Sequence, residues 1–438
     1  MKKFLFIIAF LIGFSTYSQA QALYFPPVVG NTWDTLSAGS LGWCTDKVDT
    51  LYDYLVANNS KAFILLKDGK IVLEKYFGTF TADSVWYWAS AGKTLTAFLV
   101  GIAQQENLLN IEDTTSNFLG NGWTIAPIPK ERSITIKNQL TMTTGLDDGV
   151  PDNSCTIDTC LQFLANANTR WAYHNAPYTL LDSVIESATG TNLNNYFQQK
   201  IKPLTGINGL YVSSGFNNVF YSKPRSMARF GLLMLAKGHW NATPVLTDTN
   251  YYQSMIQTSQ ALNQSYGYLW WLNGKSSFMV PGSQLIIPGP LCPSAPADMY
   301  AGLGKNGQVV NIAPSQNLVW IRMGDAPGAG IVPILMNDTI WQKLNVIMCA
   351  PNEVANTSIH NEDVRVYPNP ANSMVNIDVP LQTFSVEIID LYGRNVFLQK
   401  GIKRKIIINA STLPNGIYTA LISTNENKRI FKIAIHGN

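Results

Sequence analysis

Ser90-Ala-Gly-Lys93 opens a helical stretch that continues to Glu106 and is the most informative part of the sequence. At positions i and i+3, the side chains of Ser90 and Lys93 project from the same face of a helix. A serine hydroxyl needs an adjacent base to become a useful nucleophile, and a lysine can be that base if burial lowers its pKa. Apolar neighbours such as Trp88 favour that burial. The alternative interpretation is a serine N-cap followed by a solvated lysine.

A second element, Tyr173-His174-Asn175, is predicted to lie in a loop just before a later helix. The Tyr173 oxygen can take the proton of Ser90 or pass it to a leaving group, if Lys93 holds the phenol near ionisation. Asn175 can hydrogen-bond to Lys93 or to a substrate amide. A structural loop aromatic is the alternative for Tyr173, and an ordinary loop histidine is favoured for His174.

A third element, Gly302-Leu303-Gly304-Lys305, precedes the last predicted hairpin of the large domain. Glycines on an edge strand let a substrate backbone approach closely. The backbone N–H of Lys305, directly after Gly304, can be a second oxyanion donor beside that of Ser90. A glycine-rich turn without a functional role is the alternative.

In chain order, the motifs Ser-x-x-Lys, Tyr-x-Asn and Gly-x-Gly resemble those of the serine β-lactamase and penicillin-binding-protein superfamily. The best likeness is to its esterase, class C and 6-aminohexanoate-dimer-hydrolase-like branch, from about residue 60 to residue 325. The resemblance implies acyl-enzyme chemistry, in which Ser90 attacks a carbonyl, Lys93 and Tyr173 move protons, and water releases the acyl group. Three further stretches support it: Asn175-Ala-Pro-Tyr-Thr-Leu-Leu181, residues 223–235 and Tyr266-Gly-Tyr-Leu-Trp-Trp271.

The third motif departs from the family pattern. Gly302-Leu303-Gly304 stands where Lys-Thr-Gly or His-Thr-Gly is usual. The missing side chain normally meets the carboxylate of a β-lactam or of a peptidoglycan stem. We therefore predict a hydrolase for an amide or ester, small or peptide-like, without that carboxylate. A β-lactamase, a D-alanyl-D-alanine carboxypeptidase and a catalytically silent surface binding protein of the same fold remain alternatives.

Residue patterns around the motifs predict a mixed α/β (α+β) domain over residues 21–350. Residues 62–77 read as two strands around an Asp68-Gly69 turn, and residues 308–323 read as a second hairpin. Helical stretches lie between them at residues 91–106, 178–188 and 226–236. Terminal strands that enclose a helical middle predict an antiparallel sheet flanked by helices, with a helical subdomain. The resemblance implies the β-lactamase/transpeptidase type of this architecture.

The residue pattern changes in the C-terminal region. Residues 351–363 are polar and predict a linker, while residues 364–438 carry short alternating runs typical of a small β-sandwich. This tail resembles the C-terminal sorting domain of the type IX secretion system of Bacteroidetes, which implies contact with that machinery, outer-membrane crossing and release or attachment at the cell surface. An accessory β-domain is the alternative. The matching motifs are Val366-Tyr-Pro-Asn-Pro-Ala371, Ile389-Asp-Leu-Tyr-Gly393 and Leu413-Pro-Asn-Gly-Ile-Tyr418.

The N-terminal residues 1–20 have the pattern of a signal peptide. Lys2 and Lys3 precede an apolar run over residues 4–14, and Ser18-Gln-Ala20 supplies small residues for cleavage near Ala20. The apolar run is short for a membrane anchor, so we expect export without a transmembrane segment after cleavage.

Composition limits the remaining classes of function. The chain has 438 residues, enough for two or three folded units, and a net charge of +3 without a long basic run, which argues against a nucleic-acid partner. The cysteines lack zinc-binding spacing and the four histidines are scattered, so we expect no metal and no cofactor. Five cysteines leave at least one without an intrachain partner, and Cys155 with Cys160 can close a small loop.

Overall fold

The computed structural model describes residues 23–327, 332–349, 364–390, 395–424 and 428–435. The chain divides into two compact units, residues 1–352 and 353–438, and each is described by itself. The predicted signal peptide (1–20) and linker (351–363) lie outside the described residues, as do positions 391–393 of the middle tail motif. No helix among the residues described is both long and apolar enough to span a membrane.

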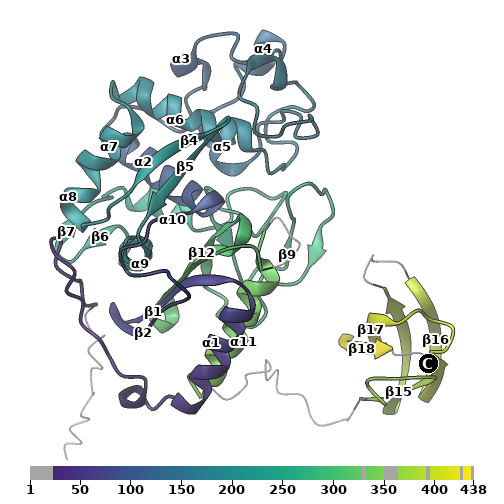
Figure 1. The fold of residues 1–438 in the computed structure, drawn as a ribbon. Coiled ribbons are helices and arrows are strands. Elements are labelled where there is room, and N and C mark those ends of the chain that lie inside the picture. The colour runs from purple at the N-terminus through teal and green to yellow at the C-terminus, as the bar shows by residue number, and fades with distance from the viewer. Residues whose placement is uncertain (1–22, 328–331, 350–363, 391–394, 425–427, 436–438) are drawn as a thin grey trace, which may run out of the picture. The chain divides into compact units, whose positions relative to one another are not determined.

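An antiparallel sheet forms the centre of the large unit, as predicted (Figure 1). Both expected hairpins are present, and Asp68 and Gly69 have the positive φ values, 49° and 82°, of a tight hairpin turn. The strands, in spatial order, are β2 (Lys70–Tyr76), β1 (Ser60–Lys67), β13 (Leu318–Gly324), β12 (Gln308–Ala313), β11 (Tyr300–Gly304) and β8 (Trp271–Leu272).

Helices from both ends of the unit cover the sheet. α1 (Val48–Ala57) and α11 (Ile334–Ile347) lie side by side, and the Cys44–Cys349 disulfide joins the segments that flank them (Figure 1). α9 (Pro224–Leu235) packs on β12 and β13 so closely that a Cβ on Gly231 would lie 2.4 Å from Cγ1 of Val319. α2 (Lys93–Gln105) is buried along most of its length and connects the sheet to the helical region.

The helical region predicted between the hairpins is present and includes several short strands. The predicted helices at 91–106, 178–188 and 226–236 correspond to α2, α6 (Asn175–Thr189) and α9. The remaining helices are α3 (Ser116–Leu119), α4 (Ile128–Glu131), α5 (Ile136–Thr141), α7 (Leu193–Lys200), α8 (Lys202–Thr205) and α10 (Thr249–Met255). A three-stranded sheet has the order β3 (Trp86–Tyr87), β5 (Asn217–Ser222) and β4 (Leu210–Ser214), and two short pairs are β6 (His239–Trp240) with β7 (Thr243–Pro244) and β9 (Ser277–Phe278) with β10 (Ile287–Pro288).

The C-terminal unit is all β among its described residues, as predicted. Two predicted strands, 374–379 and 384–389, form one long strand, and its pairing with β16 (Asn395–Asn409) shifts register between Asp378 and Thr383. Residues such as Val375 and Ile377 alternate with less buried ones and build a separate apolar core. The strands are β14 (Arg365–Tyr367), β15 (Met374–Ile389), β16 (Asn395–Asn409), β17 (Gly416–Thr424) and β18 (Lys428–Ile435), and β15 pairs with β14, β16 and β17.

Candidate active site

Ser90 lies in the 3-10 turn η3 (Ala89–Gly92), which leads directly into α2. The preceding Trp88 is buried and fixed by a hydrogen bond from its indole Nε1 to Ser222 Oγ, 2.7 Å. Ala89 has a φ of 45°, a left-handed conformation that is strained for a residue with a Cβ. The anchored tryptophan and the strained alanine therefore hold Ser90 at the start of the central helix.

Lys93 is the immediate partner of Ser90. Its Nζ donates a hydrogen bond to Ser90 Oγ at 3.2 Å, and its side chain is 4% exposed. The nitrogen lies 5.4 Å from the ring centre of Tyr173 and 3.9 Å from that of Tyr178. Burial lowers the pKa of Lys93 to about 7, and the negative charge of Asp182 opposes this shift. A substantial share of Lys93 is thus a neutral amine near neutral pH.

Tyr173 lies among buried aromatic rings. Its ring stacks on Trp271, with the centres 5.9 Å apart, and meets Tyr266 edge-on. Burial raises the pKa of Tyr173, while its hydrogen bond with Ser90 acts in the opposite direction. The neutral phenol therefore dominates at neutral pH, which differs from the hypothesis that Lys93 holds this phenol near ionisation.

Asn175 is the first residue of α6, so the predicted loop-to-helix position of the Tyr-x-Asn motif is confirmed. The Asn175 backbone N–H donates to Asn153 Oδ1 at 2.9 Å, whereas Asn175 Oδ1 is buried without a partner in the described part of the chain. His174 precedes the helix and is also buried, and burial lowers its pKa to about 4. Both of its ring nitrogens are buried without a hydrogen-bond partner among the described residues, and the structural role favoured for His174 stays a prediction.

The glycines of β11 allow this strand to touch the turn that carries Ser90. A Cβ on Gly304 would lie 2.6 Å from Trp88 O and 3.1 Å from Ser90 N. A Cβ on Gly302 would lie 2.9 Å from a Val310 methyl carbon and 3.2 Å from a backbone oxygen. The atoms nearest to a Cβ at position 302 are side-chain carbons of Val310 and Thr94 and the backbone oxygen of Ala91, so any larger side chain there would require these groups to move.

Lys305 begins the 3-10 turn η5 (Lys305–Gly307), and a buried arginine holds this turn. Arg322 donates from Nη1 to Asn306 O at 2.7 Å and to Gly307 O at 2.9 Å, and from Nε to Ser60 Oγ at 3.0 Å. Burial lowers the pKa of Arg322 to about 10, so it remains a cation at neutral pH. Arg322 was not predicted as a site residue, because its position inside a hairpin gives no local signal.

A pocket of about 440 Å³ brings the predicted residues together. Ser90, Lys93, Asn175 and Lys305 line it directly. Tyr173 lies next to Lys93, and Gly304 backs the turn of Ser90. The other lining residues, chiefly hydroxyl, amide and aromatic, are Tyr87, Ala89, Ser154, Tyr178, Ser214, Asn217, Asn218, Val219, Tyr221 and Asn306.

Two further residues on α6 belong to this site and were not predicted. Tyr178 contacts Lys93 through its ring, and Asp182 follows one helical turn later. Asp182 Oδ2 accepts a hydrogen bond from Asn218 Nδ2 at 3.0 Å, and burial raises its pKa to about 8. The spacing of Asn175, Tyr178 and Asp182 places all three on one face of a helix, and this was the available signal.

Comparison with known families identifies the class of each unit. Residues 48–328 match the family described as Beta-lactamase, and the chain belongs to that family. Residues 365–436 match the Secretion system C-terminal sorting domain. The resemblances stated from the sequence are thereby confirmed for both units.

Individual relatives are distant. A putative penicillin-binding protein, PbpX, of Bacillus subtilis is 23% identical over 201 residues, which are 42% of this chain and 47% of that protein, so the match spans about half of that relative. A solved putative β-lactamase from Bacteroides dorei has a TM-score of 0.55 at 16% identity, covering 73% of this chain and 100% of that one. A putative 6-aminohexanoate-dimer hydrolase from Bacillus anthracis has a TM-score of 0.54 at 16% identity, covering 72% and 87%. At such identities the two structures show a shared fold.

Proposed function

We propose that this protein is an exported serine hydrolase that cleaves an ester or amide through an acyl-enzyme formed on Ser90. The observation that carries the proposal is the 3.2 Å contact between Lys93 Nζ and Ser90 Oγ, made by a buried lysine whose pKa is lowered to about 7. A neutral amine in hydrogen-bond reach of a hydroxyl is the base that a serine nucleophile requires.

In the acylation step, Ser90 Oγ forms a bond to the substrate carbonyl carbon while Lys93 Nζ takes the hydroxyl proton. The carbonyl oxygen gains a negative charge, which the backbone N–H groups of Ser90 and Lys305 stabilise. The close approach of Gly304 to Ser90 N supports this pairing of donors, because it brings the end of β11 beside the turn.

The leaving group then needs a proton as the tetrahedral intermediate collapses. The raised pKa of Tyr173 makes it a neutral phenol that can donate its proton to the departing alkoxide or amine. Protonated Lys93 returns a proton to Tyr173, so both groups regain their starting forms. Water attacks the Ser90 ester in the second half-reaction, Lys93 accepts the water proton, and Ser90 Oγ recovers it as the acid product leaves.

The proposed substrate class follows from Gly302, which supplies no cation where the family motif carries one for a substrate carboxylate. Apart from Lys93 and Lys305, the pocket is lined by neutral groups, mainly hydroxyl, amide and aromatic. We therefore favour an ester or amide over a β-lactam or a D-alanyl-D-alanine peptide. The sorting domain, together with the predicted signal peptide, supports action outside the outer membrane.

Labelling with a fluorophosphonate tests the nucleophile. The full chain is expected to gain one covalent adduct, located on Ser90 by peptide mass spectrometry, and Ser90→Ala is expected to gain none. A folded protein that stays unlabelled, beside a serine hydrolase that reacts, would favour a silent binding protein.

A substrate panel tests the reaction class. Short-chain p-nitrophenyl esters and ω-amino amides are expected to turn over, with weak or no hydrolysis of nitrocefin or of a D-alanyl-D-alanine peptide. Turnover that survives Ser90→Ala would show that the nucleophile is wrong, and a preference for nitrocefin would reverse the substrate assignment.

A further inference from the structure

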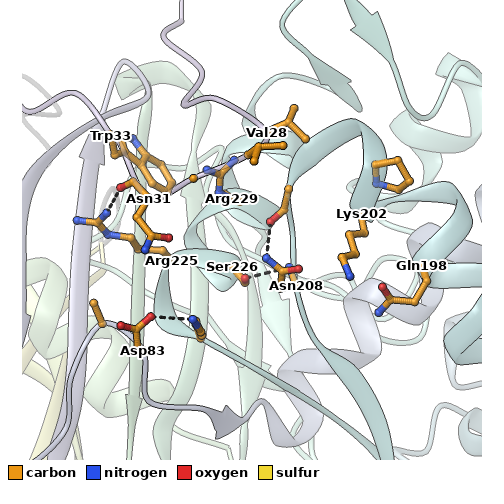
Figure 2. Close-up of a pocket in the computed structure, with 16 residues that line it drawn as sticks. Val28, Asn31, Trp33, Asp83, Gln198, Lys202, Asn208, Arg225, Ser226 and Arg229 are labelled. Carbon is orange, nitrogen blue, oxygen red and sulfur yellow. Dashed lines mark hydrogen bonds and ion pairs between the residues drawn. The ribbon is translucent and has the colours of Figure 1, made fainter.

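A second pocket, of about 650 Å³, lies apart from the one at Ser90. Its walls are the N-terminal segment 28–33, residues of α7 and α8, and the beginning of α9 (Figure 2). The two pockets share no lining residue. The hydrolase mechanism leaves this second pocket without a role.

Charges in the second pocket do not balance. The lining cations are Lys202, Lys223, Arg225 and Arg229, and the lining carboxylate is Asp83. Lys223 pairs with Asp83 at 2.7 Å, and Arg225 donates from Nε and Nη2 to the two carboxylate oxygens of Glu74, each at 2.7 Å. Two of the four cations are therefore neutralised, which leaves Lys202 and Arg229 and a local charge of about +2.

Arg229 is a buried cation whose hydrogen bonds go to neutral groups. It is 5% exposed, and its guanidinium lies 5.3 Å from the Trp33 ring centre and 5.4 Å from that of Trp240. Its donors Nη1 and Nη2 bind the carbonyl oxygens of Thr205 and Pro27, both at 2.8 Å. Burial lowers the pKa of Arg229 to about 10, so the charge persists at neutral pH. An anion nearby would offset the cost of burying that charge.

Arg229 taken alone has a simpler explanation: its hydrogen bonds to Pro27 O and Thr205 O clamp the N-terminal segment to the body of the unit. The N-terminal segment already sits tightly on the body, because a Cβ on Gly206 would lie 2.3 Å from Val28 O. Lys202 is exposed and has neither an ion pair nor a side-chain hydrogen bond within the described residues, so its charge is available to a ligand. Figure 2 shows the Lys202 side chain extending toward the amides of Asn208 and Gln198.

We propose that this pocket binds a sugar-sized molecule bearing a phosphate monoester, which is doubly charged near neutral pH. The two unbalanced cations set the charge of the ligand. A volume of about 650 Å³ lies in the range of small-molecule sites and exceeds what a bare oxyanion fills. The amide side chains of Asn208 and Gln198 can accept hydrogen bonds from hydroxyl groups on the rest of the molecule.

Calorimetric titration of the full chain at constant ionic strength tests this proposal with glucose 6-phosphate, inorganic phosphate and glucose as probes. Saturable binding of glucose 6-phosphate that weakens with added salt is expected, with no binding of glucose. Equal affinity for inorganic phosphate would overturn the sugar-sized ligand and leave a site for the free ion alone. Binding of glucose alone, or of none of the three, would overturn the proposal.

A pair of matched variants shows where the anion binds. Lys202→Gln removes an unbalanced cation from the pocket and is expected to weaken binding about tenfold. Lys200→Gln makes the same charge change two residues earlier, at a lysine that pairs with Glu106 outside the pocket, and is expected to leave affinity within about twofold. Equal losses in both variants, or none in Lys202→Gln, would contradict the assignment. Ser90→Ala is expected to bind like the wild type, which separates this result from the proposed hydrolase activity.

Discussion

The Nζ of Lys93 lies over the ring of Tyr178, 3.9 Å from the ring centre. The face of an aromatic ring favours the charged form of a lysine, whereas burial favours the neutral form. The pKa of Lys93 is lowered to about 7, so burial is the stronger effect. This balance places the lysine where it can accept and return a proton near neutral pH.

The activity is expected to rise with pH and then level off. Below pH 7 most Lys93 carries its proton and cannot accept another, since its pKa is about 7. Measured kcat/KM for a neutral ester should therefore climb with the slope of a single ionisation, with its midpoint near that value. A profile that stays flat across this range would show that Lys93 is not the base. Lys137→Gln, at an exposed lysine paired with Glu112, is the control and should keep the wild-type profile.

Lys93→Met is expected to abolish turnover and to stabilise the fold. The folded pKa of about 7 lies below the ordinary lysine value of 10.5, so between these values the unfolded chain binds more protons and stability rises with pH. The penalty for burying Lys93 is thus full below pH 7. Removing it should raise the free energy of unfolding at pH 6 by about 1–4 kcal/mol, with a smaller gain at pH 10. Denaturant unfolding at both pH values measures this, and a loss of stability at both would contradict it.

Asp182→Asn is expected to shift the pH profile toward acid. The negative charge of Asp182 raises the pKa of Lys93, so its removal lowers that pKa and moves the midpoint of kcat/KM to lower pH. The shift should be less than about one pH unit, because Asp182 has a pKa raised to about 8 and is partly protonated in this range. Asn keeps an acceptor for Asn218. Asp158→Asn, at an exposed residue, should leave the midpoint unchanged, and a move toward alkali in Asp182→Asn would refute the coupling.

Gly304→Ala is expected to damage both stability and turnover. The added Cβ would lie 2.6 Å from Trp88 O and 2.9 Å from Ala91 N, so the strand must move away from the turn of Ser90. A loss of about 1–3 kcal/mol in the free energy of unfolding and a more than tenfold lower kcat should follow. Gly39→Ala is the control, because its Cβ would meet only Ser37 Oγ, at 3.7 Å. Wild-type kcat in Gly304→Ala would argue against the oxyanion role of this strand.

The site residues that were predicted from the sequence lie close together along the chain, whereas Arg322, found only in the structure, does not. Ser90 with Lys93, and Tyr173 with Asn175, are recognisable because each pair lies within one turn of chain. Tyr178 and Asp182 could also have been predicted, from their helical spacing after Asn175. Arg322 was not, because its Nη2 binds Asn58 O across 264 residues of sequence, an arrangement that only the folded sheet creates.

The same distinction holds for the fold. Both long hairpins were predictable from alternating residues and, in the first, from the Asp68-Gly69 turn. The wall of the pocket formed by β3 and β5 was not predictable from the sequence. The pairing of these strands, which includes Trp86 with Ser222, covers only two residue pairs and leaves no periodic pattern. The second pocket depends likewise on segments that are distant in sequence, from Val28 to Arg229.

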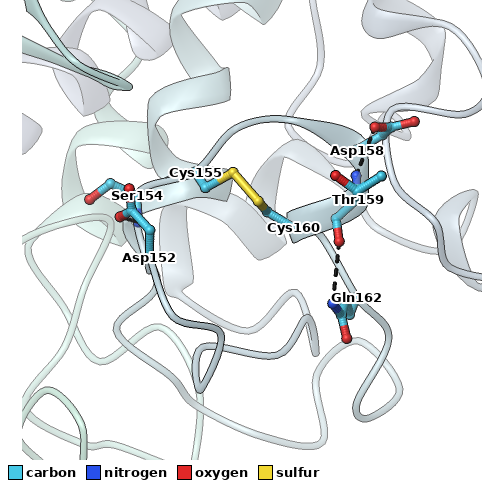
Figure 3. The surroundings of a disulfide bond; sticks show 7 residues. All are labelled: Asp152, Ser154, Cys155, Asp158, Thr159, Cys160 and Gln162. Atoms are coloured by element: carbon cyan, nitrogen blue, oxygen red, sulfur yellow. Dashed lines mark hydrogen bonds between the residues drawn. A yellow bond between two sulfur atoms is a disulfide. The ribbon is translucent and has the colours of Figure 1, made fainter.

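The two disulfides are expected to affect different properties of the protein. Cys44–Cys349 closes a separation of 305 residues, and the loop-entropy relation gives about 6 kcal/mol for its loss. Cys155–Cys160 spans only 5 residues, which corresponds to about 2 kcal/mol, but it adjoins Ser154 in the pocket (Figure 3).

The double variant Cys155→Ser/Cys160→Ser should therefore raise KM with a small loss of stability. Cys44→Ser/Cys349→Ser should lower the free energy of unfolding more and leave KM near its wild-type value. Denaturant unfolding and ester kinetics on both variants test this ranking, and the reverse order would show that the small loop does not shape the pocket.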